Sequence, residues 1–460
     1  MLKIIMMTTI ALSLSGCIFT PKYEKPKSVI DENMLLKSGN TGSTSSLVDI
    51  LAHDPILTNI IHNALINNYD LQQGMIKVQS SILQTNSATL DYIPAVAFGA
   101  SKNISMTRQI SPFDGSAVQQ KSKSYQSSLS LNSYEVDIWG RKFNEIMSLN
   151  DQRKASESAV AAIRLTLISE LSRNWYELKS LIKSWHLMSA KLSRLNEIET
   201  TLKEIDSLGR IDPVSIAKFS RGKANDESYS LTLEKEISTR INKIEYLSGM
   251  YPIQINAINW KTESGDYRIP LVNQSISSKV IFNRPDVIQA EMNITAANGT
   301  IGAARASLLP VFNLFANATH TSSSFDNILG NLTNNWTLTP SMVIPIFSLP
   351  KNYSNLKLAD KQKSLAVIEY KNTVAQALMD IKDSISEVDV ADKISQSFSA
   401  EVVRSKQQME KIDFRYRAGY GDIYSLYESV DIFHSAQLEL ENARRQKMSN
   451  TLILLKSMGG

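Results

Sequence analysis

The sequence lacks most of the residues on which disulfides, metal sites and catalytic centres are built. Its 460 residues include one cysteine, Cys17, which excludes a disulfide framework, a multi-cysteine zinc site and an iron–sulfur cluster. The five histidines are scattered without a metal-ligand spacing, and no glycine-rich phosphate-binding motif or nucleophile-elbow motif occurs. We therefore expect no enzyme activity, no catalytic residue, no metal site and no bound cofactor.

Glycine, proline and net charge are also low. The 18 glycines and 13 prolines favour long uninterrupted helices, because both residues destabilise a helix interior. A net charge of +4 gives none of the basic surface that nucleic-acid binding requires, so no nucleic acid is expected as a partner. No apolar run beyond the amino terminus is long enough to predict a transmembrane helix.

The amino terminus has the pattern of a secretory signal peptide. Residues 1–16 contain one lysine, an apolar stretch and small residues before Cys17. The junction Leu14-Ser15-Gly16-Cys17 fits a bacterial lipobox, in which the thiol takes a diacylglycerol and the new amino terminus an acyl chain such as palmitate. We expect Cys17 to be this lipidation site, and an ordinary buried cysteine is the alternative. Each buried methylene of such an anchor contributes about 0.8 kcal/mol.

The remaining chain contains an internal duplication. Asp70 precedes Pro94 by the same interval that separates Asp286 from Pro310, and Leu208-Gly209 recurs as Ala418-Gly419. A tandem duplication explains this order, and it predicts a first repeat at 57–249, a linker at 250–283 and a second repeat at 284–460.

Each repeat predicts the same series of elements. A helical stretch (57–92 or 284–308) ends at a proline and is followed by two strands, 95–104 and 123–136 in the first repeat and 311–320 and 334–345 in the second. Alternating apolar residues favour strands with one apolar face, although Pro340 interrupts the last one. The segments 105–122 and 321–333 are mostly polar, and we expect exposed loops there.

A very long helix follows in each repeat. Residues 141–208 and 351–418 contain neither glycine nor proline, which predicts helices about 100 Å long. Apolar residues at near-heptad spacing, from Leu171 to Ile205, indicate side-by-side coiled-coil packing. Returning helices are expected at 214–247 and 422–456. A cytosolic coiled coil would fit these segments alone, but it would not explain the lipobox or the strands.

Four strands cannot close a barrel, and the free edge of a sheet cannot lie in hydrocarbon because its amides would be unsatisfied. Single-chain barrels need about eight strands. The pattern therefore favours an assembly in which several chains each contribute four strands, with the long helices extending the tube. A soluble β-hairpin packed on a helical bundle is the alternative.

Several motifs, in order along the chain, resemble those of TolC-like outer-membrane efflux proteins. The strongest run from Arg284-Pro285-Asp286-Val287 through Ile301-Gly302-Ala303-Ala304-Arg305-Ala306 to Leu309-Pro310. Tyr134–Arg141 and Pro345-Ile346-Phe347 resemble the family's strand-to-helix junctions, and Arg415–Gly419 resembles a helix-hairpin tip. Cys17 followed by Pro21, Tyr23 and Pro26 is similar to the lipoprotein branch (NodT/OprM-like) that serves resistance-nodulation-division pumps.

The resemblance implies an α+β membrane protein. The expected assembly is a homotrimer whose protomers each give four strands to a twelve-stranded outer-membrane β-barrel, which continues into a periplasmic α-helical barrel. Residues 17–56 would form the lipidated amino-terminal segment, and a mixed equatorial belt would come from residues 27–56, 248–283 and the extreme carboxyl terminus. The implied partners are a periplasmic adaptor, an inner-membrane transporter of the resistance-nodulation-division type and outer-membrane lipid.

The resemblance also places a gate at the helical tips. The two tips would be Gly209–Asp212 and Gly419–Asp422, with Arg415 beside the second. The family's acidic gate positions fall on Ser425 and Glu428. Only Glu428 keeps a carboxylate, with Asp422 nearby as a substitute. A solvated helix start is the alternative for both acids, because carboxylates are favourable near a helix amino terminus.

The expected function is that of a passive exit duct for drugs or other small solutes in the outer membrane of a Gram-negative bacterium. A conduit for type I protein secretion, or for heavy-metal efflux, stays open as an alternative. A structural or adhesive lipoprotein without a channel is a further reading. The 15 methionines are scattered outside the signal peptide and are expected to be packing residues rather than metal ligands.

Overall fold

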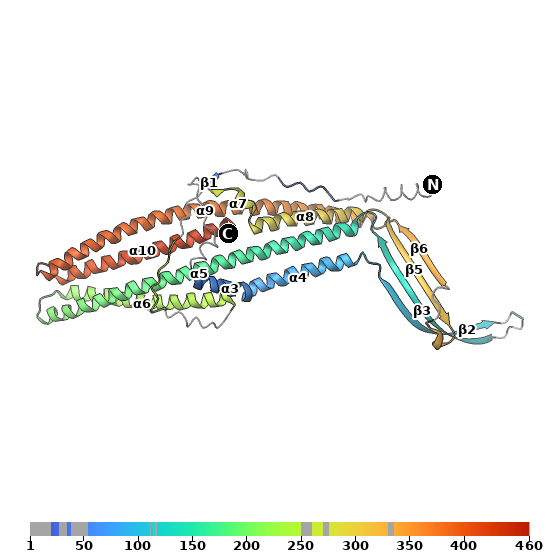
Figure 1. Cartoon of the computed structure of the whole chain (residues 1–460), viewed down its shortest axis with the longest axis horizontal. Helices are drawn as coiled ribbons and strands as arrows, with labels where there is room; N and C mark the ends of the chain where they lie inside the picture. Colours follow the sequence, from blue (N-terminus) through green and yellow to red (C-terminus); the bar gives the residue numbers. More distant parts are fainter. Residues whose placement is uncertain are drawn as a thin grey trace. The chain divides into compact units, whose positions relative to one another are not determined.

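The computed structural model describes residues 20–26, 35–37, 54–110, 112–113, 115, 117–249, 260–269, 276–329 and 335–459. The described chain is an α+β structure of long helices with one four-stranded and one two-stranded antiparallel sheet (Figure 1). Cys17 and the signal peptide lie outside the described residues. Contacts within the chain define two compact units, each of which draws segments from both sequence repeats.

The first unit contains the four-stranded sheet (residues 78–156 and 290–370, with 20–26). Its strands are β2 (Val96–Ile110), β3 (Ala117–Val136), β5 (Val311–Ser322) and β6 (Asn335–Val343), in the order β2-β3-β5-β6. All neighbours are antiparallel. Because β3 pairs with β5, the strand pairs of the two repeats form one continuous sheet, with β2 and β6 at its edges.

The first strand pair is longer than the sequence predicted. The expected loop 105–122 is wrong for most of its length, since β2 and β3 pair without interruption from Val96↔Leu131 to Ile110↔Ala117. The alternation that marks a strand was hidden because β3 carries lysines where β2 carries Ile104 and Met106. Strand preference depends on cross-strand neighbours as well as on composition, so pairing with Ile104 and Met106 outweighs the polar composition of β3.

Pro340 lies inside β6, opposite Leu314. A proline has no amide proton, and in a central strand every amide proton faces a neighbouring strand. In an edge strand every second amide faces away from the sheet, so a proline is tolerated there. The position of β6 at the sheet edge is the reason that the strand continues through this residue.

The motif Tyr134–Arg141 forms the turn from β3 into α5 (Arg141–Ser207). Arg141 Nη2 lies 2.6 Å and Nε 2.8 Å from the carboxylate of Glu135, a bidentate pair across the turn. The Trp139 indole donates to the carbonyl of Pro310 at 2.7 Å. Gly140 has φ +71°, which a side chain would strain. These residues fix the angle at which the helix leaves the strand.

The second unit is helical (residues 54–77, 157–249, 260–269, 276–289 and 371–459, with 35–37). Helices α5 and α6 (Pro213–Ser248) form one antiparallel hairpin, and α9 (Leu349–Arg417) and α10 (Ile423–Ser457) form the other (Figure 1). The other helices of the chain are α3 (Pro55–Asn67), α4 (Tyr69–Leu90), α7 (Lys279–Phe282) and α8 (Pro285–Ala306). Among the described residues, no helix has both the length and the apolarity to cross a bilayer.

The core of the second unit is built from the expected near-heptad seam. Leu171, Trp175, Leu178 and Ile182 of α5 are each at most 3% exposed. They pack with Leu57 and Ile61 of α3 and with residues of α6 and α10. Long helices of average propensity depend on such tertiary burial for most of their stability.

The expected single helix 57–92 is two helices. Asn68 ends α3, and its side-chain oxygen accepts the amide of Leu71 at 3.0 Å to begin α4. Its side-chain amide also donates to the carbonyl of Leu247 at 2.9 Å, at the end of α6. Asparagine competes for backbone hydrogen bonds in this way, which favours it at helix boundaries over helix interiors.

The second repeat makes the same bond with a different residue. Arg284 Nη1 donates to the carbonyl of Ser457 at 3.1 Å, at the end of α10. Its guanidinium also pairs with Asp286 at 2.7 Å and with Asp380 of α9 at 3.3 Å. Arg284 and Ser457 stand at the offsets from Asn68 and Leu247 that relate the repeated motifs. The Arg-Pro-Asp motif is therefore a structural anchor for the end of α10.

Parts of the expected equatorial belt meet in the described structure. Strand β1 (Leu35–Lys37) pairs antiparallel with β4 (Ile276–Ser277). Two belt segments that are far apart in the sequence thus form a two-stranded sheet, while most of the remaining belt lies outside the described residues.

We expect Arg284→Leu to lower the thermal unfolding midpoint of the purified protein, because it removes a cation whose side chain is 12% exposed and leaves a helix-end carbonyl unsatisfied. Loss of hydrogen bonds to a charged group of this kind costs about 1.5–3 kcal/mol. Arg404→Leu on α9 is the control, since Arg404 pairs with Glu401 while 68% exposed and such pairs contribute under about 1 kcal/mol. Equal effects of the two substitutions would contradict the anchoring role.

Candidate functional site

The four-stranded sheet has two chemically different faces. Strand register places Val96, Phe98, Leu129, Leu131 and Trp336 on one face. The same face carries Phe312, Leu314, Ala316, Ala318, Leu338 and Met342. Several of these side chains are strongly exposed, including Phe98 at 56% and Trp336 at 69%. An exposed apolar face of this extent marks a surface that contacts lipid or another chain.

The opposite face is mostly polar. Cross-strand neighbours there are Ser101 with Gln126, Ser128 with Thr319, and Asn317 with Thr337. Phe315 and the Val311–Val343 pair are apolar exceptions, and Glu135 adds one charge where β3 meets α5. A sheet that is apolar on one side and mostly polar on the other fits a wall between hydrocarbon and water.

The two helical hairpins turn at equivalent glycines. Gly209 has φ +65° and Gly419 has φ +78°. The next amide in each turn bonds back to the helix, Arg210 to the carbonyl of Ile205 at 3.2 Å and Tyr420 to the carbonyl of Arg415 at 2.9 Å. This is the Schellman arrangement, in which a left-handed residue satisfies the last carbonyls of a helix. The structure thus gives the predicted tip residues Gly209, Gly419 and Arg415 a local role in the turn.

The predicted acidic tip residues begin the returning helices. Asp212 accepts the amide of Ser215 at 3.3 Å, and Asp422 accepts the amide of Ser425 at 2.8 Å and its hydroxyl at 2.5 Å. These hydrogen bonds from Ser425 lower the pKa of the Asp422 carboxyl. Asp422 and Ser425 therefore form one helix cap, while Glu428 is exposed on the next turn of α10.

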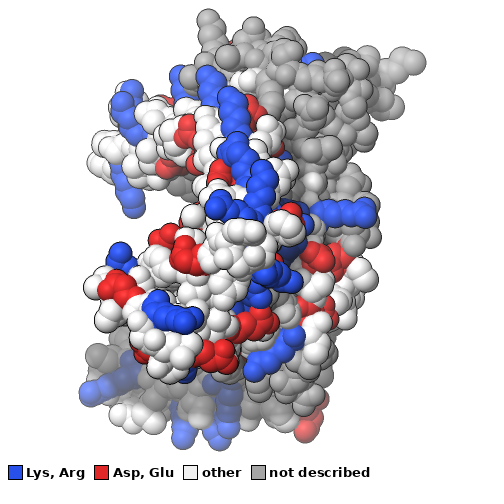
Figure 2. Space-filling view, turned by 90° about the vertical axis from the view of Figure 1, so that its left-hand side faces the viewer, with Lys and Arg blue, Asp and Glu red and all other residues white. Residues whose placement is uncertain are grey.

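Figure 2 looks along the molecule from the end at which the helical hairpins turn. Lysine and arginine side chains lie beside aspartate and glutamate side chains on this face, so neither sign covers it alone. Exposed apolar side chains add to it, namely Leu208, Val214, Phe414 and Tyr420, the last 81% exposed. A mixed surface with exposed aromatic anchors is typical of a protein contact site.

A small core joins the two hairpins near their tips. Leu195, Ile198, Leu202 and Phe219 of the first hairpin pack against Ile423, Leu426, Tyr427 and Val430 of the second. The rings of Phe219 and Tyr427 meet edge to face, with centroids 5.0 Å apart. A Cβ at Gly222 would lie 2.1 Å from the Tyr427 hydroxyl oxygen. Glycine at this position is thus what lets Tyr427 reach α6.

One buried lysine links both hairpins above this core. Lys191 of α5 has its Nζ 2.8 Å from a carboxylate oxygen of Asp226 on α6 and 2.7 Å from one of Asp431 on α10. Burial raises the pKa of Asp226 against the opposing effect of Lys191. Burial also lowers the pKa of the neighbouring His434 to about 4. A second link joins Arg194 of α5 to Asp413 of α9 at 2.7 Å.

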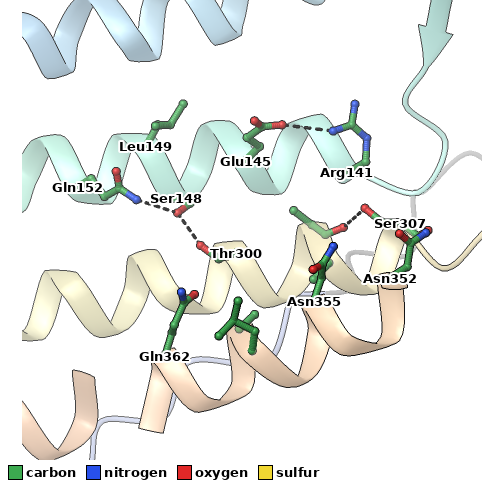
Figure 3. Close-up of a pocket in the computed structure, with 14 residues that line it drawn as sticks. Arg141, Glu145, Ser148, Leu149, Gln152, Thr300, Ser307, Asn352, Asn355 and Gln362 are labelled. Carbon is green, nitrogen blue, oxygen red and sulfur yellow. Dashed lines mark hydrogen bonds and ion pairs between the residues drawn. The ribbon is translucent and has the colours of Figure 1, made fainter. Parts of the chain in front are cut away.

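A groove of about 500 Å³ lies in the first unit, next to the sheet, between α5, α8 and α9 (Figure 3). Its lining is largely hydroxyl and amide. Ser148 and Thr300 are 3.1 Å apart, and Asn352 donates to the carbonyl of Ser307 at 2.7 Å. Among the residues that the structure describes, no group of three or more His, Cys, Asp or Glu could hold a metal ion. The groove therefore has a mixed lining, in which hydroxyl and amide groups lie beside Leu149, Leu358 and alanine side chains.

The sequence profile of the family described as "Outer membrane efflux protein" matches residues 60–200 and 276–460. The matched ranges cover well over half of the chain, including most of α5, all of α9, the junctions of both helices with the sheet and the Arg-Pro-Asp motif. The chain belongs to the outer membrane efflux protein family. It is accordingly an efflux protein of the Gram-negative outer membrane, and the family resemblance drawn from the motifs is confirmed.

Curated relatives match along their whole length. The chain is 25% identical to the probable outer membrane lipoprotein SilC of Salmonella typhimurium, covering 100% of this chain and 98% of SilC. It is 24% identical to the outer membrane protein OprJ of Pseudomonas aeruginosa, over 98% of this chain and 94% of OprJ.

Solved structures share the fold. The Campylobacter jejuni CmeC outer membrane channel has a TM-score of 0.83 and 20% sequence identity, covering 96% of this chain and 95% of CmeC. A structure of CusC has a TM-score of 0.82 at 19% identity, covering 96% of this chain and 100% of that one. The expected α+β architecture is confirmed by this likeness.

The residues that join the hairpins of this efflux protein escaped the sequence analysis. Lys191, Asp226 and Asp431 are isolated charges in long polar helices, and their meeting depends on how three helices pack. Gly222 carried a usable signal, because a glycine inside a long helix lowers helix stability and often marks close packing.

We expect Gly222→Ala to destabilise the hairpin junction, although alanine in a helix usually stabilises by about 1 kcal/mol relative to glycine. The added methyl would meet the Tyr427 hydroxyl, and overpacking of this kind costs about 1–3 kcal/mol. In a Tyr427→Phe background the nearest remaining ring atom is 3.4 Å away, so the same substitution should be neutral or stabilising. Thermal unfolding of the four proteins measures the coupling, and the same loss in both backgrounds would refute the contact.

Proposed function

We propose that the protein is the passive exit duct of a tripartite efflux pump, assembled as a homotrimer. The observation that carries this proposal is the four-stranded sheet, with one apolar face, one mostly polar face and two open edges. In hydrocarbon, every backbone amide needs a partner. Three copies would bring twelve strands, and β2 of one protomer would pair with β6 of the next, which closes the sheet around a polar lumen.

The helical hairpins would form the inner end of the duct. Their tips carry exposed aromatic residues beside charges of both signs, which suits the docking of a periplasmic adaptor that connects the duct to an inner-membrane transporter of the resistance-nodulation-division type. Opening requires a partner that binds the open arrangement better than the closed one. The Lys191 and Arg194 ion pairs and the Gly222–Tyr427 contact would hold the two hairpins together until that partner binds.

The lipid on Cys17 would add an anchor to the barrel. SilC, a relative over the whole chain, bears the name of a lipoprotein, and the lipobox of this chain supports the same modification. Transport through the duct needs no catalytic residue and no cofactor beyond this covalent diacylglycerol and acyl chain, since the transporter supplies the energy.

Small solutes, including drugs, are the proposed cargo. Relatives with full-length matches include an "Antibiotic efflux pump outer membrane protein" and a "Toluene efflux pump outer membrane protein" of Pseudomonas putida. The heavy-metal alternative has support from CusC of Escherichia coli, a "Cation efflux system protein" that is 22% identical over 98% of this chain.

Deleting the gene in a Gram-negative strain without other efflux ducts should raise the accumulation of dyes and antibiotics, and wild-type protein should restore it. Gly419→Val should fail to restore it, because a β-branched residue at φ +78° distorts the tip turn. Gly115→Val is a matched control, since Gly115 also has positive φ, at +66°, and open space around it, but lies in the β2–β3 turn. Unchanged accumulation with the trimer present in the outer membrane would reject small-solute efflux.

Glu428→Ala tests the gate. Three symmetry-related carboxylates near one axis would repel one another and attract cations, so their removal should change the conductance of purified trimers in planar bilayers and weaken block by divalent cations. Glu439→Ala on the same helix, also exposed, is the control. If Glu428→Ala behaves like Glu439→Ala in both measurements, Glu428 is only part of a solvated helix start.

A further inference from the structure

The β2–β3 hairpin continues beyond the rest of the sheet. The last residue of β3 that pairs with β5 is Tyr125, opposite Ser322. Strands β2 and β3 remain paired from there out to Ile110 and Ala117, and this extension projects past the ends of β5 and β6 (Figure 1). Within the first unit, α4, α5, α8 and α9 adjoin the opposite end of the sheet, where β2 and β5 begin and β3 and β6 end.

Basic side chains gather on one face of this extension. Lys102 is opposite Tyr125, Lys123 is opposite Ile104, Lys121 is opposite Met106, and Arg108 is opposite Gln119. The Lys102 ammonium lies 5.4 Å from the centre of the Tyr125 ring. We call Lys102, Arg108, Lys121 and Lys123 the basic collar. All four side chains are exposed.

The basic collar is on the apolar face of the sheet. Antiparallel register places Lys102 and Arg108 on the same side of β2 as Val96 and Phe98, because residues two apart share a face. The collar therefore continues the apolar face, with Ile104, Met106 and Ile110 between its charges. Long basic side chains can lie along such a surface and hold their charges at its boundary.

The corresponding hairpin of the second repeat has no such charges. Residues 96–134 contain four basic residues and one acidic residue, Asp114, whereas residues 311–343 contain no lysine or arginine. The duplication thus left the collar on one strand pair only. If these charges served only to keep exposed loops soluble, charges of both signs would be expected on both hairpins. Instead, basic residues lie on one face of one hairpin.

The apolar face below the collar has the height of a membrane. From Val136 to Tyr125, β3 rises about 36 Å along the strand at 3.3 Å per residue. A tilt of about 45° reduces this to about 25 Å, the height of the apolar band of an outer-membrane barrel. Trp336, Tyr125 and Phe325 lie toward the upper limit of this band, and Tyr125 and Phe325 are in contact with centroids 5.6 Å apart. The collar begins where the aromatic residues end.

We propose that the basic collar binds the phosphate groups of lipid A in the outer leaflet of the membrane. A ligand for this surface needs acyl chains for the apolar band and closely spaced anionic groups directly above it, and diphosphorylated lipid A has both. The proposal rests on the proposed function in one respect, namely that the helices project into the periplasm, which places the collar on the outer side. Three copies would give the trimer a ring of twelve basic residues.

The test measures binding of hexa-acylated diphosphoryl lipid A to purified full-length trimers by native mass spectrometry. Lys121→Gln/Lys123→Gln should weaken binding roughly tenfold, since each basic residue near an anionic lipid surface contributes appreciably to attraction. Lys361→Gln/Lys382→Gln removes the same charge from exposed sites on α9 and should leave binding unchanged. Monophosphoryl lipid A should bind the wild type more weakly than the diphosphoryl form.

Equal lipid A binding by the collar variant and the wild type would overturn the proposal. Equal affinity of the wild type for phosphatidylglycerol would also overturn it, because the collar would then attract any anionic lipid. Conductance of the same trimers in planar bilayers is recorded separately. A wild type that binds lipid A but does not conduct would reject the exit-duct function, while conducting trimers with unaltered lipid A binding in the variant would reject only the collar.

Discussion

The open edges of the four-stranded sheet are the constraint on which the rest of the structure depends. An exposed row of amides and carbonyls is tolerable in water but not in hydrocarbon. The sheet of one protomer has an apolar face and two edges, β2 and β6, so it can enter a membrane only if other copies cover those edges. In the proposed trimer, closure by further copies would also place the polar face on the inside. Assembly and conduction would then both follow from the unpaired edges of the sheet.

The helical part follows a different rule. Its helices bury a near-heptad seam, and their ends are held by specific polar contacts such as the Asn68 bond to Leu247 and the Asp422 cap. Near their tips the two hairpins are joined by Lys191 with its two carboxylates, by the Arg194–Asp413 pair and by the core that contains the Phe219–Tyr427 pair.

Local and periodic features could be predicted from the sequence. The long helices lack glycine and proline, the tip glycines follow them directly, and the repeated motifs show the duplication. The extension of β2 and β3 was missed because lysines in β3 mask the alternation, and the break at Asn68 was missed because helical residues flank it on both sides. The contacts of Lys191, Asp226 and Asp431 depend on the mutual rotation of three helices, which no local pattern encodes. Cys17 and the trimer remain predictions.

Asn68 and Arg284 close equivalent helix ends by different means. The amide of Asn68 is neutral, so its bond to Leu247 is nearly indifferent to dissolved ions. Arg284 acts together with Asp286 and Asp380, whose side chains are 40% and 34% exposed, and mobile ions weaken such partly exposed pairs. The two repeats therefore form this hydrogen bond at equivalent positions, but the donor is a neutral amide in one repeat and a charged guanidinium in the other. The contact at the end of α6 is thus insensitive to ionic strength, whereas the contact at the end of α10 weakens as the salinity of the surrounding fluid rises.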